Sequence, residues 1–261
     1  MTSSTYPSSN QWHWSDDYWP DALGSIHYTA GREFESAEEA EEFLSREVAE
    51  GNSEIDQLSQ CGRTPLHFAC EWGSIYGVKW LVAQNANVNV KDDNGLTPYL
   101  CSCTSSVDTL KKMVVLEDSG CDVPPISIIL AAQNQYSSLE KAQEVLHHLA
   151  WANGISVDSQ DDWMPSELTS APLYSAFTSG SIFGVQWLIS NGANVTVLKN
   201  AGEELYESVC TCSVDTLEKL RILEEIGCQI SPRAIVFAAG LHFALAEEAF
   251  ELLEHFVNKK E

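Results

Sequence analysis

Basic side chains are scarce in this chain. Its 261 residues include 14 Lys and Arg against 38 Asp and Glu, which gives a formal net charge of −24 at pH 7. Proteins that bind nucleic acids neutralise phosphates with Lys and Arg, and attraction to anionic membranes depends on the same residues. The composition therefore argues against nucleic-acid and membrane partners. It leaves open a basic protein or peptide, or a protein bound through apolar contacts.

Long apolar runs are also missing. No stretch approaches the roughly 20 apolar residues of a membrane span, and Met1–Asn10 lacks the apolar core of a secretory signal peptide. We therefore expect a cytoplasmic or nuclear protein. In those compartments its eight cysteines would be reduced thiols.

The motifs of common catalytic and cofactor sites do not occur. The sequence has no glycine-rich phosphate loop, no nucleophile elbow and no HExxH pair. Cys101-x-Cys103 and Cys210-x-Cys212 do not form the quartet of a zinc site, and small apolar residues are expected at these positions. We predict no catalytic residue, no metal site and no cofactor. A binding protein is thus favoured over an enzyme.

The stretch Gly62–Asn89 has the pattern of two short helices joined by a turn. Thr64-Pro65 is a helix start, because proline is pre-organised for the first helical turn. Gly73 separates the first apolar run from a second, and Asn85–Asn89 supplies loop residues at the exit. Such a hairpin cannot bury both apolar faces alone, so it must stack on similar units. A second Thr-Pro pair follows 33 residues later, at Thr97-Pro98.

These residues resemble the ankyrin repeat, which opens on a TPLH-type motif and closes on a GADVN-type motif. Here the opening is Thr64-Pro65-Leu66-His67 and the close is Asn85–Asn89. The resemblance implies an all-α ankyrin-repeat solenoid of about six and a half helix-turn-helix repeats with a non-repeat N-terminal extension. It also implies a protein–protein interaction module, with His67 as a structural residue that hydrogen-bonds backbone between neighbouring repeats.

A larger repeat is superimposed on the short one. Gly73–Val78 recurs as Gly180–Val185, and Val107–Leu110 recurs as Val214–Leu217, both at a spacing of 107 residues. A single spacing without gaps indicates a tandem duplication of a three-repeat block.

The domain boundaries are predicted from these patterns. Ser36–Ala49 begins with a capping box and carries one apolar stripe, so we expect it to be the second helix of a degenerate capping repeat. The predicted parts are an aromatic and acidic extension over residues 1–30, the capping repeat over 31–57, and two blocks of repeats over 58–158 and 159–261.

The candidate binding surface combines the end of a first helix with the loops between repeats. Glu71 and Trp72 occupy variable positions where an ankyrin-like first helix faces the concave groove, and tryptophan is enriched at binding hot spots. The acidic loops could bind a basic segment, although they are also typical of solvated turns. The predicted partner-binding residues are Glu71, Trp72, Asp92, Asp93, Asn94, Asp161, Asp162 and Trp163.

The N-terminal extension has aromatic side chains among acidic ones. The aromatic residues are Trp12, Trp14, Tyr18 and Trp19. They could pack on the repeats as a cap or plug, which would cover Trp72, or form a free docking motif. An extension folded onto the groove could also enclose a pocket. The alternative function is therefore that of an enzyme or a small-molecule-binding protein.

Overall fold

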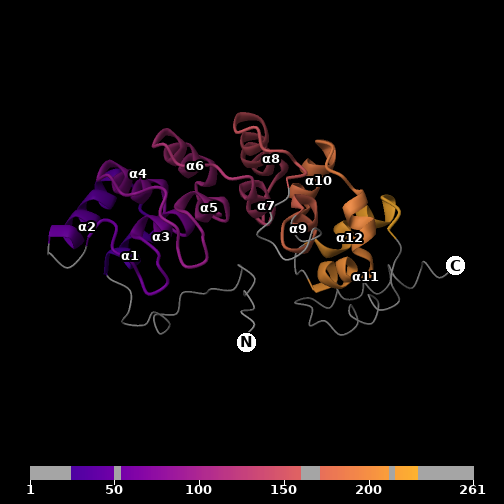
Figure 1. Ribbon diagram of the computed structural model, residues 1–261, viewed down its shortest axis with the longest axis horizontal. Coiled ribbons are helices and arrows are strands. Elements are labelled where there is room, and N and C mark those ends of the chain that lie inside the picture. The colour runs from indigo at the N-terminus through magenta and orange to yellow at the C-terminus, as the bar shows by residue number, and fades with distance from the viewer. Residues whose placement is uncertain (1–24, 50–53, 160–170, 212–214, 229–261) are drawn as a thin grey trace. The chain divides into compact units, whose positions relative to one another are not determined.

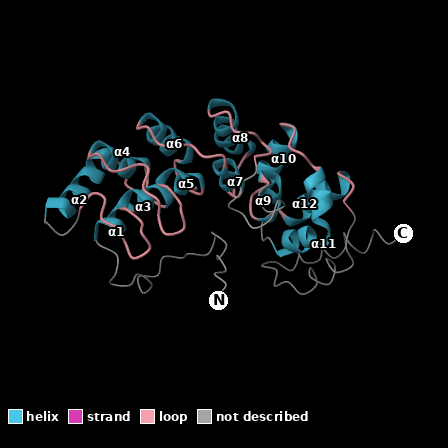
Figure 2. Cartoon of the chain, viewed as in Figure 1, coloured by secondary structure: helices cyan, strands magenta, loops and turns pink. Residues whose placement is uncertain are grey.

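The computed structural model describes residues 25–49, 54–159, 171–211 and 215–228 (Figure 1). Within these ranges the regular elements are all helices, and no strand occurs (Figure 2). The predicted all-α fold is thus confirmed. None of the described helices is long and apolar enough to span a bilayer. The chain divides into two compact units, Met1–Pro98 and Tyr99–Glu261.

The first unit consists of two packed helical hairpins. Its helices are α1 (Ser25–Ala30), α2 (Ala37–Ala49), α3 (Pro65–Glu71) and α4 (Ile75–Ala83). Within each hairpin α1 contacts α2 and α3 contacts α4; between the hairpins, α1 packs on α3 and α2 on α4 (Figure 1). First helices therefore form one layer and second helices the other.

The second unit repeats this arrangement. Its helices are α5 (Pro98–Cys103), which begins at the boundary, α6 (Thr109–Asp118), α7 (Ile126–Ala132), α8 (Leu139–His147), the π-helix η1 (His148–Ala152), α9 (Pro172–Thr178), α10 (Ile182–Ser190), α11 (Thr196–Thr211) and α12 (Thr216–Glu225). Here α9 packs between α7 and α11, while α8 contacts both α6 and α10, and α10 contacts α12.

Two glycines allow successive hairpins to approach closely. A Cβ added to Gly73 would lie 2.5 Å from the carbonyl oxygen of Ala30, and one added to Gly180 would overlap the carbonyl oxygen of Ala132. Any larger side chain would push the hairpins apart. Gly73 and Gly180 are separated by the predicted 107 residues and make equivalent contacts.

The helices α6 and α12, which belong to the next hairpin in each sequence block, also begin alike. Asp108 precedes α6 and Asp215 precedes α12, both in the left-handed conformation with φ of 50° and 54°. Four residues later Lys112 and Lys219 are fully buried. Lys219 Nζ donates to the carbonyl oxygen of Gly180 at 2.5 Å, so α12 is fastened to the turn between α9 and α10.

The first repeat starts earlier than the sequence suggested. The helix expected over Ser36–Ala49 is present as α2, but α1 lies within the segment predicted to be a non-repeat extension. Ile26 and His27 of α1 are completely buried, and His27 Nε2 donates to the carbonyl oxygen of Gln57 at 2.8 Å. The predicted boundary at residue 30 is therefore corrected: α1 is the first helix of a complete hairpin. Residues 229–261, which include the whole of the predicted final repeat, lie outside the described ranges.

Candidate partner-binding surface

Arg63 connects two of the predicted acidic residues. Its Nη1 donates to Glu71 Oε2 at 2.6 Å, and its Nε donates to Asp92 Oδ2 at 2.9 Å. Its guanidinium carbon lies 5.7 Å from the centroid of the Trp72 ring. One arginine in the loop before α3 thus links the end of that helix to the next loop. Sequence analysis missed this role, although Arg63 is one of few cations and directly precedes the Thr-Pro motif.

Asp92 is a structural residue rather than a surface one. Its side chain is 0% exposed, and its Oδ1 accepts hydrogen bonds from the backbone N–H groups of Asn94 and Leu96, both at 2.9 Å. The prediction of Asp92 as a partner-binding residue is therefore corrected. The carboxylate closes its own loop and pairs with Arg63. An Asp in a turn-forming sequence is equally typical of a residue that closes the turn and of one that is exposed for binding, so the sequence could not distinguish these two roles.

The next two residues of the same loop remain on the surface. Asp93 and Asn94 are both exposed. The backbone N–H of Asp93 donates to the carbonyl oxygen of Cys61 at 3.1 Å, which joins this loop to the preceding one. Gly62 is required at that junction, because a Cβ there would lie 2.7 Å from Asp93 Oδ1 and its φ is +70°. The exposed carboxylate of Asp93 is therefore held on a well-connected loop.

Glu71 and Trp72 are half-buried at the C-terminal end of α3. The Trp72 ring packs against Phe68 with a centroid separation of 5.3 Å. Glu71 is bound to Arg63, so its charge is already partly neutralised. Both side chains are consequently held in place by neighbours, which favours a pre-organised surface.

The remaining predicted site residues lie outside the described ranges. These are Asp161, Asp162 and Trp163 in the long loop, and Trp12, Trp14, Tyr18 and Trp19 in the extension. The plug, the docking motif and the enclosed pocket all depend on the second group, so these hypotheses stay predictions.

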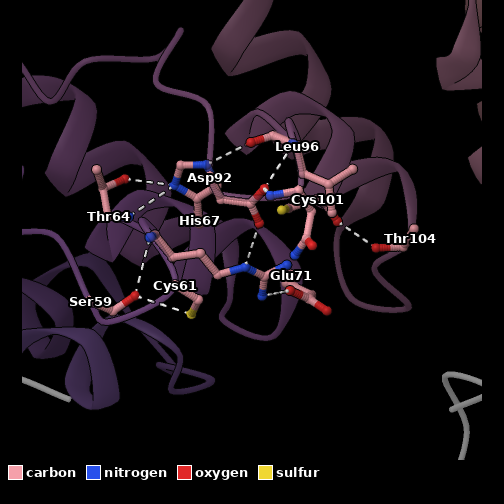
Figure 3. Close-up of polar contacts among 11 residues, drawn as sticks. Ser59, Cys61, Thr64, His67, Glu71, Asp92, Leu96, Cys101 and Thr104 are labelled. Carbon is pink, nitrogen blue, oxygen red and sulfur yellow. Dashed lines mark hydrogen bonds and ion pairs between the residues drawn. The ribbon is translucent and has the colours of Figure 1, made fainter. Parts of the chain in front are cut away.

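His67 has the structural role implied by the resemblance. It is fully buried; its Nδ1 accepts from the backbone N–H of Thr64 at 3.1 Å, and its Nε2 donates to the carbonyl oxygen of Leu96 at 3.1 Å (Figure 3). Burial is the main cause that lowers the pKa of His67. A neutral imidazole therefore connects α3 to the loop of the next repeat.

The cysteines behave as core residues where sequence analysis expected it. Cys70, Cys101, Cys103 and Cys210 are buried. Burial raises the pKa of Cys210 to about 11 and that of the half-buried Cys121 to about 12. These two thiols stay protonated at neutral pH and are poor nucleophiles. Within the described part of the chain, no group of three or more His, Cys, Asp or Glu side chains could hold a metal ion.

Comparison with known proteins places these hairpins in a family. Residues 27–127 match the family model of ankyrin repeats in three copies. The ankyrin repeat protein OPG189 of variola virus is 22% identical over 166 residues, and the match covers 64% of this chain and 26% of that protein. The chain thus spans about a quarter of the length of the curated relatives it matches.

Solved structures share the fold at low sequence identity. The crystal structure of the human ASB11 ankyrin repeat domain has a TM-score of 0.56 and 21% identity, covering 88% of this chain and 98% of that one. A chain in the structure of the predatory endopeptidase Bd0816 from Bdellovibrio bacteriovorus, in complex with immunity protein Bd3460, has a TM-score of 0.50 and 18% identity. That match covers 67% of this chain and 84% of the other. The Thr-Pro-Leu-His motif, the stacked hairpins and the family match thus show that residues 27–127 contain ankyrin repeats, and the chain shares the ankyrin-repeat fold.

Proposed function

We propose that this chain is a non-enzymatic adaptor that binds a basic segment of a partner protein on the surface formed by Trp72, Asp93 and Asn94. Ankyrin repeats generally mediate protein–protein interaction, and one structural neighbour was solved in complex with a protein. The general function, binding of a protein, is inferred from the ankyrin repeats. The choice of surface and the basic character of the partner are inferred from this chain's own residues.

The observation that carries the proposal is the cluster that Arg63 forms with Glu71, Asp92 and Trp72, called the Arg63 cluster. It holds Trp72 beside a loop whose Asp93 carboxylate is exposed and has no ion-pair partner among the described residues. Glu71 and Asp92 outnumber the single positive charge of Arg63, so the cluster is acidic even before Asp93 is counted. A fixed aromatic ring next to uncompensated negative charge suits a cationic segment with an apolar residue.

The test begins with a partner captured on the immobilised full-length chain and identified by mass spectrometry. Its affinity is then measured by titration calorimetry for the unmodified chain, Trp72→Ala, Trp72→Phe and Asp93→Asn. Removal of a hot-spot tryptophan typically costs about tenfold or more in Kd. We expect that loss for Trp72→Ala, a smaller one for Trp72→Phe, and about a threefold loss for Asp93→Asn.

A matched control separates a local contact from general charge attraction. Glu41 on α2 is exposed, so Glu41→Gln removes the same single charge at another place. Equal effects of Asp93→Asn and Glu41→Gln, together with an unchanged Kd for Trp72→Ala, would reject this surface. Helicity of each variant, measured by circular dichroism, shows that the fold is retained.

A further inference from the structure

A largely exposed tryptophan lies on the second-helix layer of the Tyr99–Glu261 unit. Trp151 is 66% exposed, the highest value among the exposed large hydrophobic side chains of the described residues, whereas Trp187 on α10 is 4% exposed. Sequence analysis did not single out Trp151, because a tryptophan near the end of an amphipathic helix is usually part of the core. An indole left in water is a candidate for contact with another molecule.

The backbone that carries Trp151 is held in place by a polar network. Trp151 belongs to η1, and π-helical turns are rare and frequently found at functional sites. His148 Nε2 lies 3.0 Å from both carboxylate oxygens of Glu117 on α6, and Asn153 Nδ2 donates to the same carboxylate at 3.1 Å. The buried Tyr99 hydroxyl donates to it at 2.6 Å. Glu117 therefore makes polar contacts with His148 and Asn153, on both sides of Trp151, and these contacts fix the turn from which the exposed indole projects.

Acidic side chains continue the same face of the helix. Glu140, Glu144, His147 and Trp151 are separated by four, three and four residues, so they form one stripe along α8 and η1. The His147 and Trp151 rings are in contact, with centroids 5.8 Å apart. Both glutamates are exposed, and Lys141 is their neighbour on the helix. The stripe thus joins an aromatic end to an acidic end.

We propose that this stripe binds an arginine-bearing segment of a protein partner. An arginine guanidinium would stack on the exposed face of Trp151, and a further basic residue of the segment would face Glu140 and Glu144. Arginine is favoured over lysine because its planar, weakly hydrated cation stacks best on an indole. The acidic charges disfavour a phosphate-bearing partner at the same place.

This surface is different from the one proposed above. It is built from the second helix of its repeat and a π-helical turn, whereas the Trp72 surface is built from the end of a first helix and a loop. It is also not repeated, since the residues 107 positions after His147 and Trp151 are Glu254 and Asn258. The inference therefore concerns a separate docking site, and its test does not depend on whether the Trp72 surface binds a partner.

The experiment uses the full-length chain labelled with 5-fluorotryptophan, whose fluorine NMR signal for Trp151 is assigned from Trp151→Phe. Octa-arginine is the probe, and octa-citrulline is its uncharged control of nearly the same shape. At about 0.15 M salt, where distant surface charges are largely screened, we expect the Trp151 signal to shift saturably with octa-arginine and not with octa-citrulline. Loss of one exposed cation–π contact corresponds to roughly a two- to fivefold change in Kd. Trp151→Ala should therefore raise Kd, measured by calorimetry, by about that factor.

The charge contribution is tested with two matched double variants. Glu140→Gln/Glu144→Gln should weaken octa-arginine binding at Trp151 by about threefold or more. Glu41→Gln/Glu42→Gln removes two exposed carboxylates from α2 and should leave it nearly unchanged. Equal weakening by both double variants, an equal shift with octa-citrulline, or an unperturbed Trp151 signal would each overturn the proposal. Thermal unfolding of each variant confirms that it is folded.

Discussion

Two adjacent aspartates in one loop are expected to respond differently to the same substitution. The Asp92 side chain is completely buried, and Asp93 is exposed. We expect Asp92→Ala to lower the free energy of unfolding by about 3 kcal/mol, and Asp93→Ala to change it by less than about 0.5 kcal/mol. For partner affinity the expected order is reversed at equal folded concentration, because only Asp93 offers its carboxylate to another molecule.

The magnitude follows from the contacts of Asp92. Its carboxylate accepts two backbone hydrogen bonds at 2.9 Å and one from Arg63 Nε at 2.9 Å. Breaking a buried ion pair on one side costs about 3–5 kcal/mol. The lower end applies here, because Arg63 is 13% exposed and retains Glu71 as a partner. Asp92→Asn keeps an oxygen for the two N–H groups and loses only the charge, so we expect a loss of about 1 kcal/mol.

Urea denaturation of the three variants, followed by circular dichroism and by tryptophan fluorescence, measures these differences. Coincident transitions by the two probes justify a single free energy of unfolding. Equal losses for Asp92→Ala and Asp93→Ala would refute the assignment of one buried and one exposed carboxylate. A loss for Asp92→Asn as large as for Asp92→Ala would show that Arg63, rather than the loop N–H groups, dominates the contribution of Asp92.

Two further predictions concern the contacts between repeats. Gly180→Ala should lower the free energy of unfolding by about 2 kcal/mol or more, since its methyl group would overlap the carbonyl oxygen of Ala132. In Gly184→Ala the nearest neighbour of the new methyl group lies at 3.6 Å, so this variant should be neutral or stabilised by up to about 1 kcal/mol. Urea denaturation compares the two variants, and equal midpoints would contradict the close approach at Gly180. Because burial lowers the pKa of His67 below its ordinary value of 6.5, the unfolded chain binds the proton more readily, so the stability from neutral His67 is full above about pH 6.5 and is lost as the pH falls. Urea midpoints from pH 8 to pH 5 for the unmodified chain and His67→Gln measure this, and parallel pH profiles would argue against it.

Much of the fold could be predicted from local residues. Helix α3 begins at Pro65, the position expected from the Thr-Pro pair, because proline satisfies the geometry of a first helical turn without needing a neighbour. Helix α1 was missed because Ser25 stands where Pro65 stands in the next repeat, although Ile26-His27 matches Leu66-His67. This six-residue helix is stabilised by packing against α2 and α3. Packing of that kind leaves no start signal in the residues of the helix itself, so the helix could not be predicted from them.

The candidate site was predictable only in part. Glu71 and Trp72 were identified from their position in the repeat, and both lie in the Arg63 cluster. The exposure of Trp151 depends on η1, whose π-helical turn and polar anchor Glu117 leave no simple periodic signal in the sequence. Helical spacing alone places a tryptophan on a face but does not say whether another helix covers that face.

The sequence by itself determined the hairpin unit, its stacking and the resemblance to ankyrin repeats, because proline starts, separating glycines and a 33-residue period are requirements of the backbone that each repeat carries locally. Only the tertiary structure decided which carboxylates are buried and which tryptophan is exposed. Asp92 is withdrawn from water by Arg63, which lies 29 residues away along the chain, and Trp151 is displayed by Glu117 of the preceding repeat. Burial and pairing depend on neighbours that are distant in sequence, so they are settled only when the repeats have stacked.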